Sequence, residues 1–315
     1  MTVKRLEFIV TYLCNSNCRH CQLGGEGRRK DLPNHIDKNL AIDIVRRVGE
    51  SYKPKSIMTF GGEPMLYPEV VYAIHNEAMH VGIPSRELIT NGFWSKNTSR
   101  IQQMAMNLSR SGVNDVGFSV DCFHQEFIPL KYVKEAAQAL LKAGVQKIEW
   151  NPCWVVSEDD KNEYNTRTKS ILSELEKLPI RRGEGNILRP EGRAIENLKD
   201  YLPRKTAILQ SRCGEIPYTE RLDSVKGISV EPDGRVAVCN QFYVGNASDT
   251  DIIELLEQYD PYKIPEAKAI IENGMKGLVE WGATKGIQQD PEGYYSVCDM
   301  CTAIRRKATR MNHSS

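Results

Sequence analysis

The chain has 315 residues, of which 26% are charged and 40% hydrophobic, and this is enough for about two domains of an ordinary globular protein. Lysine and arginine total 42 against 41 for aspartate and glutamate, so the net charge of +1 argues against a surface built chiefly to hold nucleic acid or an anionic membrane. No apolar run approaches the roughly 20 residues of a membrane span, and the first residues lack the pattern of a secretory signal, so we expect a cytoplasmic protein.

The first two thirds of the chain alternate strand-like and helix-like segments. We expect strands over 6–13, 56–60, 87–90, 116–120 and 147–156, separated by helical stripes within 40–48, 70–81, 98–111, 133–141 and 171–178. Regular alternation of this kind implies parallel strands with right-handed crossovers. About six units fit, which predicts an α/β fold with a partial (β/α)6 barrel over residues 1–205.

After about residue 205 the rhythm changes. Residues 226–239 have a strand–turn–strand pattern, and short helices are expected over 251–258 and 265–274. We therefore expect a second, smaller domain over 206–304 and a flexible tail over 305–315. The core of such a domain is thin, so a metal cluster would be a reasonable source of its stability.

The chain contains nine cysteines, an odd number with no export signal before them. Metal binding or catalysis explains them better than a scaffold of disulfides does. Cys14, Cys18 and Cys21 lie within eight residues, just after the first expected strand. Three local thiolates suit a [4Fe–4S] cluster with one iron left open. A structural zinc site, the alternative, would need a fourth ligand, which His20 beside Cys21 is poorly placed to supply.

The segment Cys14-Asn-Ser-Asn-Cys18-Arg-His20-Cys21 has the form CxxxCxφC and resembles the signature of the radical S-adenosylmethionine (SAM) enzymes. The resemblance implies that SAM chelates the open iron and that one electron from the cluster enters its sulfonium. A 5′-deoxyadenosyl radical then removes a hydrogen atom from the substrate. The resemblance also places His20 among the cofactor-binding residues and implies an electron donor such as flavodoxin or ferredoxin.

Weaker matches stand at later strand ends. Gly61-Gly62-Glu63-Pro64 resembles the GGEP segment with which family members hold the amino group of SAM, although such a string alone is only a turn. Asn91 ends the third expected strand and is a further candidate. The resemblance implies that Ser119, in the fourth strand, and Lys131, about a dozen positions later, bind the carboxylate of SAM. Alternatively, Lys131 is a solvated residue at the start of a helix.

Cys213, Cys239, Cys298 and Cys301 form a second set. The hairpin ends in a GxxxxC pattern at Cys239, and Cys298-Asp-Met-Cys301 is a CxxC, which together resemble the twitch module of radical SAM enzymes, a shortened SPASM module. The resemblance implies one auxiliary [4Fe–4S] cluster held by all four cysteines, and a zinc site is the alternative. The segment from Arg189 to Ala194 resembles a loop that follows the sixth strand in the same family.

Three residues are candidates for the chemistry itself. Asp121 and His124 follow the fourth strand, on the side of the barrel where such enzymes keep their active sites, although a lone loop histidine is often only solvated. Strand parity places Cys153 on the lumen side, where it could return a hydrogen atom to a substrate radical or merely fill space, unless Pro152 disturbs the parity. The same parity makes Cys122 a buried structural thiol.

The substrate is the least determined part. Residues 91–94 read NGFW and resemble a group of peptide epimerases, but Asn240 stands where those enzymes have a hydrogen-donating cysteine. We expect an oxidoreductase that modifies a ribosomally made peptide. The alternatives are the same chemistry on an alcohol or sugar, and a non-catalytic iron–sulfur or zinc protein. Two basic triplets, 28–30 and 305–307, are expected to be solvated.

Overall fold

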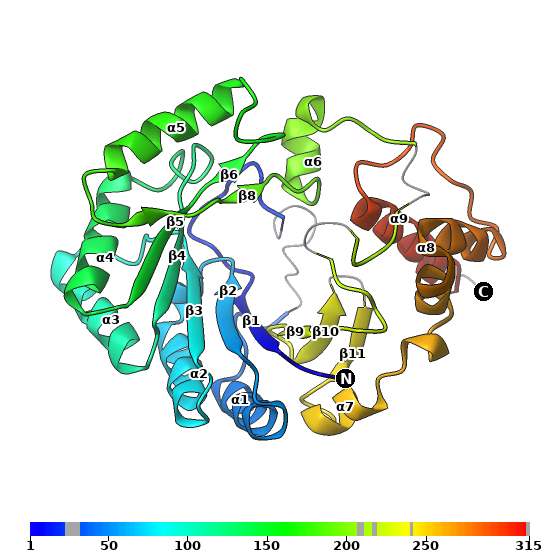
Figure 1. Cartoon of the computed structure of the whole chain (residues 1–315), viewed down its shortest axis with the longest axis horizontal. Coiled ribbons are helices and arrows are strands. Elements are labelled where there is room, and N and C mark those ends of the chain that lie inside the picture. Colours follow the sequence, from blue (N-terminus) through cyan, green and yellow to red (C-terminus); the bar gives the residue numbers. More distant parts are fainter. Residues whose placement is uncertain (23–31, 207–210, 216–218, 240–241, 313–315) are drawn as a thin grey trace.

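The computed structural model describes residues 1–22, 32–206, 211–215, 219–239 and 242–312, with side chains as far as Arg310, so the basic triplet 28–30 and Asn240 lie outside the described residues. A curved sheet of nine strands runs in the order β11-β10-β9-β1-β2-β3-β4-β5-β7. Helices α1 to α5 cover its outer side, and α8 and α9 lie beyond the edge of the sheet that β11 forms (Figure 1).

The barrel consists of the six strands from β1 to β7 in the sheet order and the helices that connect them. The strands are β1 (Arg5–Thr11), β2 (Ser56–Gly61), β3 (Ser85–Thr90), β4 (Asp115–Ser119), β5 (Lys147–Asn151) and β7 (Arg181–Arg182), and the helices are α1 (Lys38–Tyr52), α2 (Pro68–His80), α3 (Thr98–Arg110), α4 (Leu130–Lys142) and α5 (Glu163–Leu175). All these neighbouring strands pair in parallel. The predicted partial barrel is therefore confirmed, and its mouth is the side at which the carboxyl ends of the strands meet.

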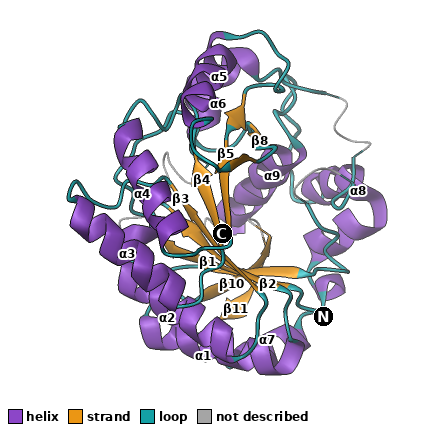
Figure 2. Cartoon of the chain, turned by 60° about the vertical axis from the view of Figure 1, so that its left-hand side comes forward, coloured by secondary structure: helices purple, strands orange, loops and turns teal. Residues whose placement is uncertain are grey.

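Apolar residues on alternate positions of each strand hold the helices against the sheet. Leu6, Phe8 and Val10 of β1 are buried in the same core as Ile44 and Val48 of α1. Figure 2 shows α1 to α4 packed along one face of the strands. The opposite face is left to line the lumen of the barrel.

The expected strand over 147–156 is divided in the structure. β5 ends at Asn151, and Cys153–Trp154 form a short strand, β6, that pairs with β8 (Asn186–Ile187) in a separate two-stranded sheet. Pro152 lies at the break, since proline has no N–H to donate to the ladder. The first strand likewise ends at Thr11 rather than residue 13, because the Thr11 hydroxyl accepts from Leu13 N at 2.9 Å and turns the chain.

The C-terminal part extends the barrel sheet. Its elements are the strands β9 (Gly227–Val230), β10 (Arg235–Cys239) and β11 (Phe242–Asn246), the helices α7 (Ile252–Gln258), α8 (Pro265–Ala283) and α9 (Val297–Asn312), and the 3-10 turn η4 (Pro261–Lys263). Helix α6 (Arg193–Leu198) and the 3-10 turn η2 (Lys199–Tyr201) precede it, and the 3-10 turn η1 (Pro64–Leu66) lies in the barrel between β2 and α2. β9 pairs in parallel with β1, and β10 is antiparallel to β9. The predicted boundary at residue 206 therefore falls within one continuous sheet.

The helix expected over 265–274 ends as predicted at Gly274, whose φ of 61° and ψ of −147° are not helical, and a second helical stretch continues α8 to Ala283. One expectation for the C-terminal end was wrong. Residues 305–312, expected to be a flexible tail, continue α9, and Arg305 packs over the ring of Phe242 at 3.9 Å. Within the described ranges, no helix is both long and apolar enough to cross a membrane.

Candidate functional site

The loop that carries the first three cysteines is fixed at its root to the end of β2. Gly62 N donates to Thr11 O at 2.7 Å, and Glu63 N donates to Leu13 O at 2.9 Å. A Cβ atom on Gly62 would lie 2.0 Å from Leu13 O, and one on Gly61, whose φ is +142°, would lie 2.4 Å from Thr11 O. Only glycine permits this approach, so the two glycines bring the cysteine loop against the GGEP turn.

The side chain of Glu63 ties β2 to β3. Its carboxylate accepts from Thr90 Oγ1 at 2.8 Å, Asn91 N at 2.8 Å and Met65 N at 3.0 Å. Burial raises its pKa to about 7, and these hydrogen bonds oppose the rise. Because three donors already surround this carboxylate, the backbone carbonyls of the turn, including that of Gly62, are better acceptors for a ligand's ammonium group.

Asn91 connects β3 to the cysteine loop. Its side-chain amide donates to Asn15 Oδ1 at 2.8 Å and to Cys14 Sγ at 3.8 Å, while its Oδ1 accepts from Phe93 N at 2.9 Å. Asn15 in turn donates to Phe93 O at 2.7 Å. The residue expected to contact the cofactor therefore also positions Cys14.

Cys18 and Cys21 stand on a tight turn of the same loop. Cys21 N donates to Cys18 O at 3.3 Å, and Ser16 Oγ lies 2.9 Å from Cys18 Sγ. Burial raises the pKa of Cys18 to about 12, and the neighbouring Cys14 and Cys21 thiols add to the rise. The three cysteines thus share one region at the end of β1.

The donor set of this loop suits a cluster better than a single ion. A structural zinc ion takes four protein ligands, whereas a [4Fe–4S] cube held by three cysteines leaves one iron open. The chemistry of the first cysteine set therefore fits a [4Fe–4S] cluster.

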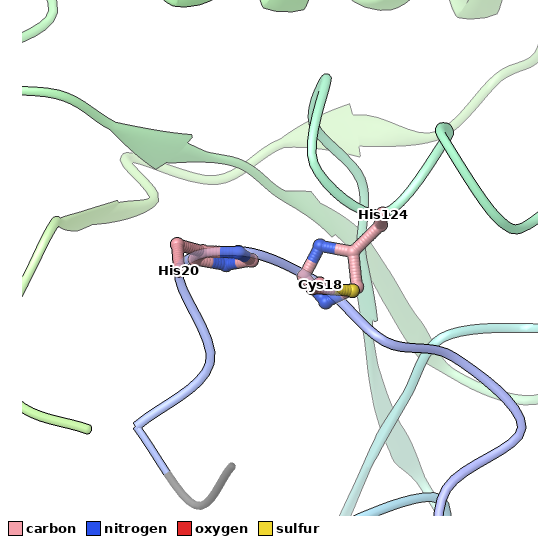
Figure 3. Close-up of side chains that lie close together, drawn as sticks. All are labelled: Cys18, His20 and His124. Atoms are coloured by element: carbon pink, nitrogen blue, oxygen red, sulfur yellow. The ribbon is translucent and has the colours of Figure 1, made fainter. Parts of the chain in front are cut away.

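Cys18 also approaches two histidines (Figure 3). The ligand atoms of Cys18, His20 and His124 lie within 4.8 Å of one another, from the cysteine loop and the loop after β4. The ring of His20 stacks on Phe123, with centroids 4.6 Å apart. Burial lowers the pKa of His20 to about 4, so its ring is neutral and offers a flat wall beside the cysteines.

Asp121 is the hub of the loop after β4. It is fully buried, and its carboxylate accepts from the backbone N–H groups of Phe123 and His124 at 3.0 Å and from Cys153 N at 3.2 Å. His124 Nδ1 lies 2.9 Å from both carboxylate oxygens. Burial alone would raise the pKa of Asp121, but the charge of His124 and these hydrogen bonds hold it well below its usual range.

Asp121 and His124 form an ion pair at the mouth, which also affects Cys153. Burial would lower the pKa of His124, but Asp121 raises it above its usual value, so His124 carries a positive charge beside the carboxylate. Burial and the charge of Asp121 raise the pKa of the half-buried Cys153 well above its usual value, so this residue is a thiol rather than a thiolate. Cys122 is buried and its N–H donates to Thr168 Oγ1 at 3.1 Å, as expected of a structural residue.

Ser119 and Lys131 lie apart from this network. Ser119 is the half-buried last residue of β4. Lys131 lies in the first turn of α4, with 75% of its side chain exposed and its ammonium 3.7 Å from Glu135. Their contact with the carboxylate of SAM stays a prediction.

The second cysteine set comes together from three parts of the chain. Cys213 precedes β9, Cys239 ends β10, and Cys298 and Cys301 lie in the first turns of α9. Burial raises the pKa of Cys213 to about 12 and that of Cys298 to about 11, and nearby thiols add to both rises. Burial raises the pKa of Cys301 well above its usual value, and the other three thiols of the set add to the rise. The four thiols are therefore near neighbours in one largely buried region.

One contact of the cysteine loop was missed by sequence reasoning. Arg193 N donates to Cys21 O at 3.0 Å, and its guanidinium donates to Asn17 O at 2.7 Å. The only signal for it in the sequence is the resemblance of the Arg189–Ala194 segment to a loop of the family, which names no partner.

Comparison with known proteins agrees with this geometry. Residues 8–160 match the family model of the Radical SAM superfamily. The probable GTP 3′,8-cyclase of Sulfurisphaera tokodaii is 26% identical over 157 residues, covering 48% of this chain and 47% of that protein. The GTP 3′,8-cyclase of Tolumonas auensis is 26% identical over 221 residues, covering 65% and 60%. The matches therefore span about half to three fifths of these curated relatives.

Solved structures show the same fold. Native anSMEcpe with bound AdoMet has a TM-score of 0.56 at 16% identity and covers 98% of this chain and 97% of its own. BtrN in complex with AdoMet and 2-DOIA has a TM-score of 0.50 at 13% identity and covers 87% and 89%. The cysteine loop at the mouth of the partial barrel lies within residues 8–160, the part of the chain that matches the Radical SAM superfamily.

Proposed function

We propose that the chain is a radical SAM enzyme whose Cys14, Cys18 and Cys21 hold a [4Fe–4S] cluster with one iron open to SAM. A cluster held there would supply the electron that cleaves a bound SAM, which is the chemistry that would remove a hydrogen atom from the substrate. The observation that carries the proposal is the hydrogen-bonded unit in which the GGEP turn and Asn91 position the cysteine loop at the mouth.

The residues around this loop would bind SAM. Backbone carbonyls of Gly61 to Pro64 would accept from its ammonium, and Ser119 and Lys131 would bind its carboxylate. The neutral ring of His20 would pack against it without adding a charge. An electron donor such as flavodoxin or ferredoxin would reduce the cluster, because none of the protein's own side chains is a reductant of that strength.

The second cysteine set would hold one auxiliary [4Fe–4S] cluster. With four protein ligands, such a cluster has no open iron for a substrate, so its use would be electron exchange. This favours an oxidation of the substrate over a reaction that is neutral in electrons.

We infer that the substrate is a ribosomally made peptide. Five apolar side chains that are 41–50% exposed lie at the end of a strand or in the segment after one: Leu13, Leu66, Phe127, Val156 and Ile187. A chain of amino acids offers side chains to such a surface, and the Asp121–His124 pair would bind a peptide carbonyl or amide beside it. Cys153, as a thiol next to Asp121, would be the hydrogen donor if the product radical is quenched.

A small molecule is the second candidate, because the chain is similar to GTP 3′,8-cyclases over much of the barrel. The two are separated by incubating the reduced enzyme and SAM with the peptide encoded beside its gene, with GTP, and with an amino-sugar alcohol. Transfer of deuterium from only one labelled substrate into 5′-deoxyadenosine identifies the class. Transfer from GTP or the alcohol, and none from the peptide, would overturn the peptide proposal.

The cofactor proposal is tested by metal content. Reconstituted protein is expected to hold about eight irons per chain, four in each cube. Changing Cys14, Cys18 and Cys21 to Ala removes half of the iron and abolishes formation of 5′-deoxyadenosine. Changing Cys298 and Cys301 to Ala removes the other half and leaves some cleavage of SAM. Zinc at either site after anaerobic purification, or bound SAM that is never cleaved under strong reductant, would favour the non-catalytic alternative.

A further inference from the structure

Ser16 places a hydroxyl group inside the first cysteine loop. Its Oγ lies 2.9 Å from Cys18 Sγ, which is within hydrogen-bond distance for an oxygen and a sulfur. Ser16 is 7% exposed and Cys18 is 6% exposed, so this contact is largely shielded from water. Shielding strengthens the hydrogen bond, because the local dielectric is low and water does not compete for either atom.

The chemistry of a cluster ligand fixes the direction of this hydrogen bond. In the protein without a cluster, either the hydroxyl or the thiol could be the donor. A cysteine that binds a metal has lost its proton, so its sulfur can only accept. Ser16 Oγ is therefore the donor whenever Cys18 serves as a ligand of the proposed [4Fe–4S] cluster.

Asn91 makes a second side-chain contact with a sulfur of the same loop. Its Nδ2 lies 3.8 Å from Cys14 Sγ and also donates to Asn15 Oδ1 at 2.8 Å. The longer distance and the shared amide group make this contact weaker than that of Ser16. Of the two contacts, the hydroxyl of Ser16 therefore has the larger effect on a ligand sulfur.

A donor to a ligand sulfur favours the reduced state of an iron–sulfur cluster. The reduced state carries one more negative charge, part of which lies on the ligand sulfurs, and a hydrogen bond stabilises that state more than the oxidised one. The reduction potential therefore rises. A higher potential allows a weaker donor to reduce the cluster, but it leaves less driving force for passing the electron to SAM.

We propose that Ser16 is a tuning residue, whose hydrogen bond to Cys18 raises the reduction potential of the SAM-binding cluster toward that of its electron donor. The proposal rests on that cluster of the proposed function. Ser16 acts through Cys18, so it is a positioning residue rather than a catalytic one. The electron comes from the flavodoxin or ferredoxin, no covalent bond changes, and the hydroxyl keeps its proton.

The test measures the potential in full-length protein whose Cys298 and Cys301 are Ala, without SAM. Reduction is followed by electron paramagnetic resonance at a series of fixed potentials. The ratio of reduced to oxidised cluster is taken among the clusters present, so partial loss of iron does not alter it. Ser16→Ala is expected to lower this ratio about tenfold at a given potential, a shift of about 59 mV for one electron. Ser16→Thr keeps the hydroxyl and is expected to keep the parent ratio.

Ser111→Ala is the matched control. Ser111 is 8% exposed, and its Oγ donates to Leu108 O at 2.9 Å, at the end of α3 and just before β4 begins. This end of the barrel is opposite the mouth. The control loses a buried hydrogen bond of the same length without touching a sulfur, so its ratio is expected to equal that of the parent.

The rate of 5′-deoxyadenosine formation, measured with all nine cysteines present, separates tuning from damage to the loop. With flavodoxin as the donor, Ser16→Ala is expected to be about tenfold slower than the parent, because a smaller fraction of the cluster is reduced. With an excess of a strong chemical reductant, the variant is expected to match or exceed the parent, whereas a displaced loop would slow both reactions.

Two results would overturn the proposal: equal ratios in the parent and Ser16→Ala, or a tenfold loss in Ser16→Thr as well, since the hydroxyl would then not be the cause. Failure of the proposed function looks different. A parent protein that holds no iron at Cys14, Cys18 and Cys21 would refute the SAM-binding cluster itself.

Discussion

The closest backbone approach at the site makes Gly62 the most sensitive position for substitution. A Cβ atom there would lie 2.0 Å from Leu13 O, whereas ordinary contacts begin near 3.4 Å. Gly62→Ala therefore forces the Leu13 carbonyl to retreat by about 1 to 1.4 Å. That movement breaks the 2.9 Å hydrogen bond from Glu63 N and shifts the loop that leads to Cys14.

A displacement of about 1 Å at an active site lowers the rate about 100-fold. We expect Gly62→Ala to form 5′-deoxyadenosine about 100-fold more slowly and to lose part of the iron held by the first cysteine set, while the auxiliary iron is retained. Iron per chain and 5′-deoxyadenosine are measured on anaerobically reconstituted protein.

Gly144→Ala is the control. Nothing lies within 4 Å of a Cβ atom there, but φ is +80°, so alanine costs about 1–2 kcal/mol in backbone strain without touching the site. Its iron content and rate should equal those of the parent protein. If Gly62→Ala keeps the full iron content and the parent rate, the close approach of the two loops does not position the cluster.

Two further variants test single residues. Cys153→Ala is expected still to form 5′-deoxyadenosine but to lose or divert the normal product, and an unchanged product and rate would remove Cys153 from the mechanism. Burial lowers the pKa of His75 from 6.5 to about 3, so this histidine contributes stability that is present above pH 6.5 and is lost as the pH falls. Between pH 7.5 and pH 5.5 the loss is about 1.4 kcal/mol, which is expected to be absent in His75→Gln. Urea unfolding of both proteins at both pH values measures it, and equal pH dependence would contradict the assignment.

Local patterns predicted the barrel well. Apolar alternation in β1 and β4 and apolar stripes in α1 and α4 depend on neighbours in the sequence, and the structure has them where the pattern is strongest. The division at Pro152 could be anticipated, because proline has no N–H to donate to the ladder. The extension of α8 past Gly274 could not, because glycine ends many helices and only packing against other parts decides whether the chain turns helical again.

Contacts between distant residues account for what the sequence did not reveal. The GGEP resemblance places Glu63 at the amino group of SAM, whereas its carboxylate is buried and occupied by donors from β3. Arg193 meets Asn17 across 176 positions, and no periodicity links them. Such roles depend on the direction of individual side chains after folding, which spacing along the chain leaves open.

Asp121 offers a test of whether the loop after β4 serves the substrate or the cofactor. In Asp121→Asn, one carboxylate oxygen becomes an amide NH₂, which cannot accept from Cys153 N or His124 Nδ1. His124 keeps at most the hydrogen bond to the remaining oxygen and loses its charged partner, and breaking such a buried ion pair costs about 3–5 kcal/mol of folding free energy. Asp115→Asn, at the other end of β4, removes only the ion pair with Lys147 near the surface and is expected to cost about 0–1 kcal/mol.

Stability and chemistry are separated by the double variant Asp121→Asn with His124→Gln. Removing the unpaired charge should restore much of the lost stability, because the penalty comes from leaving His124 charged and buried. If the pair binds the substrate, the double variant still forms 5′-deoxyadenosine from SAM but turns over the substrate about 100-fold more slowly. Loss of 5′-deoxyadenosine formation in a folded double variant with full iron content would instead place Asp121 and His124 on the cofactor, since the reaction of SAM would then depend on them before any substrate takes part.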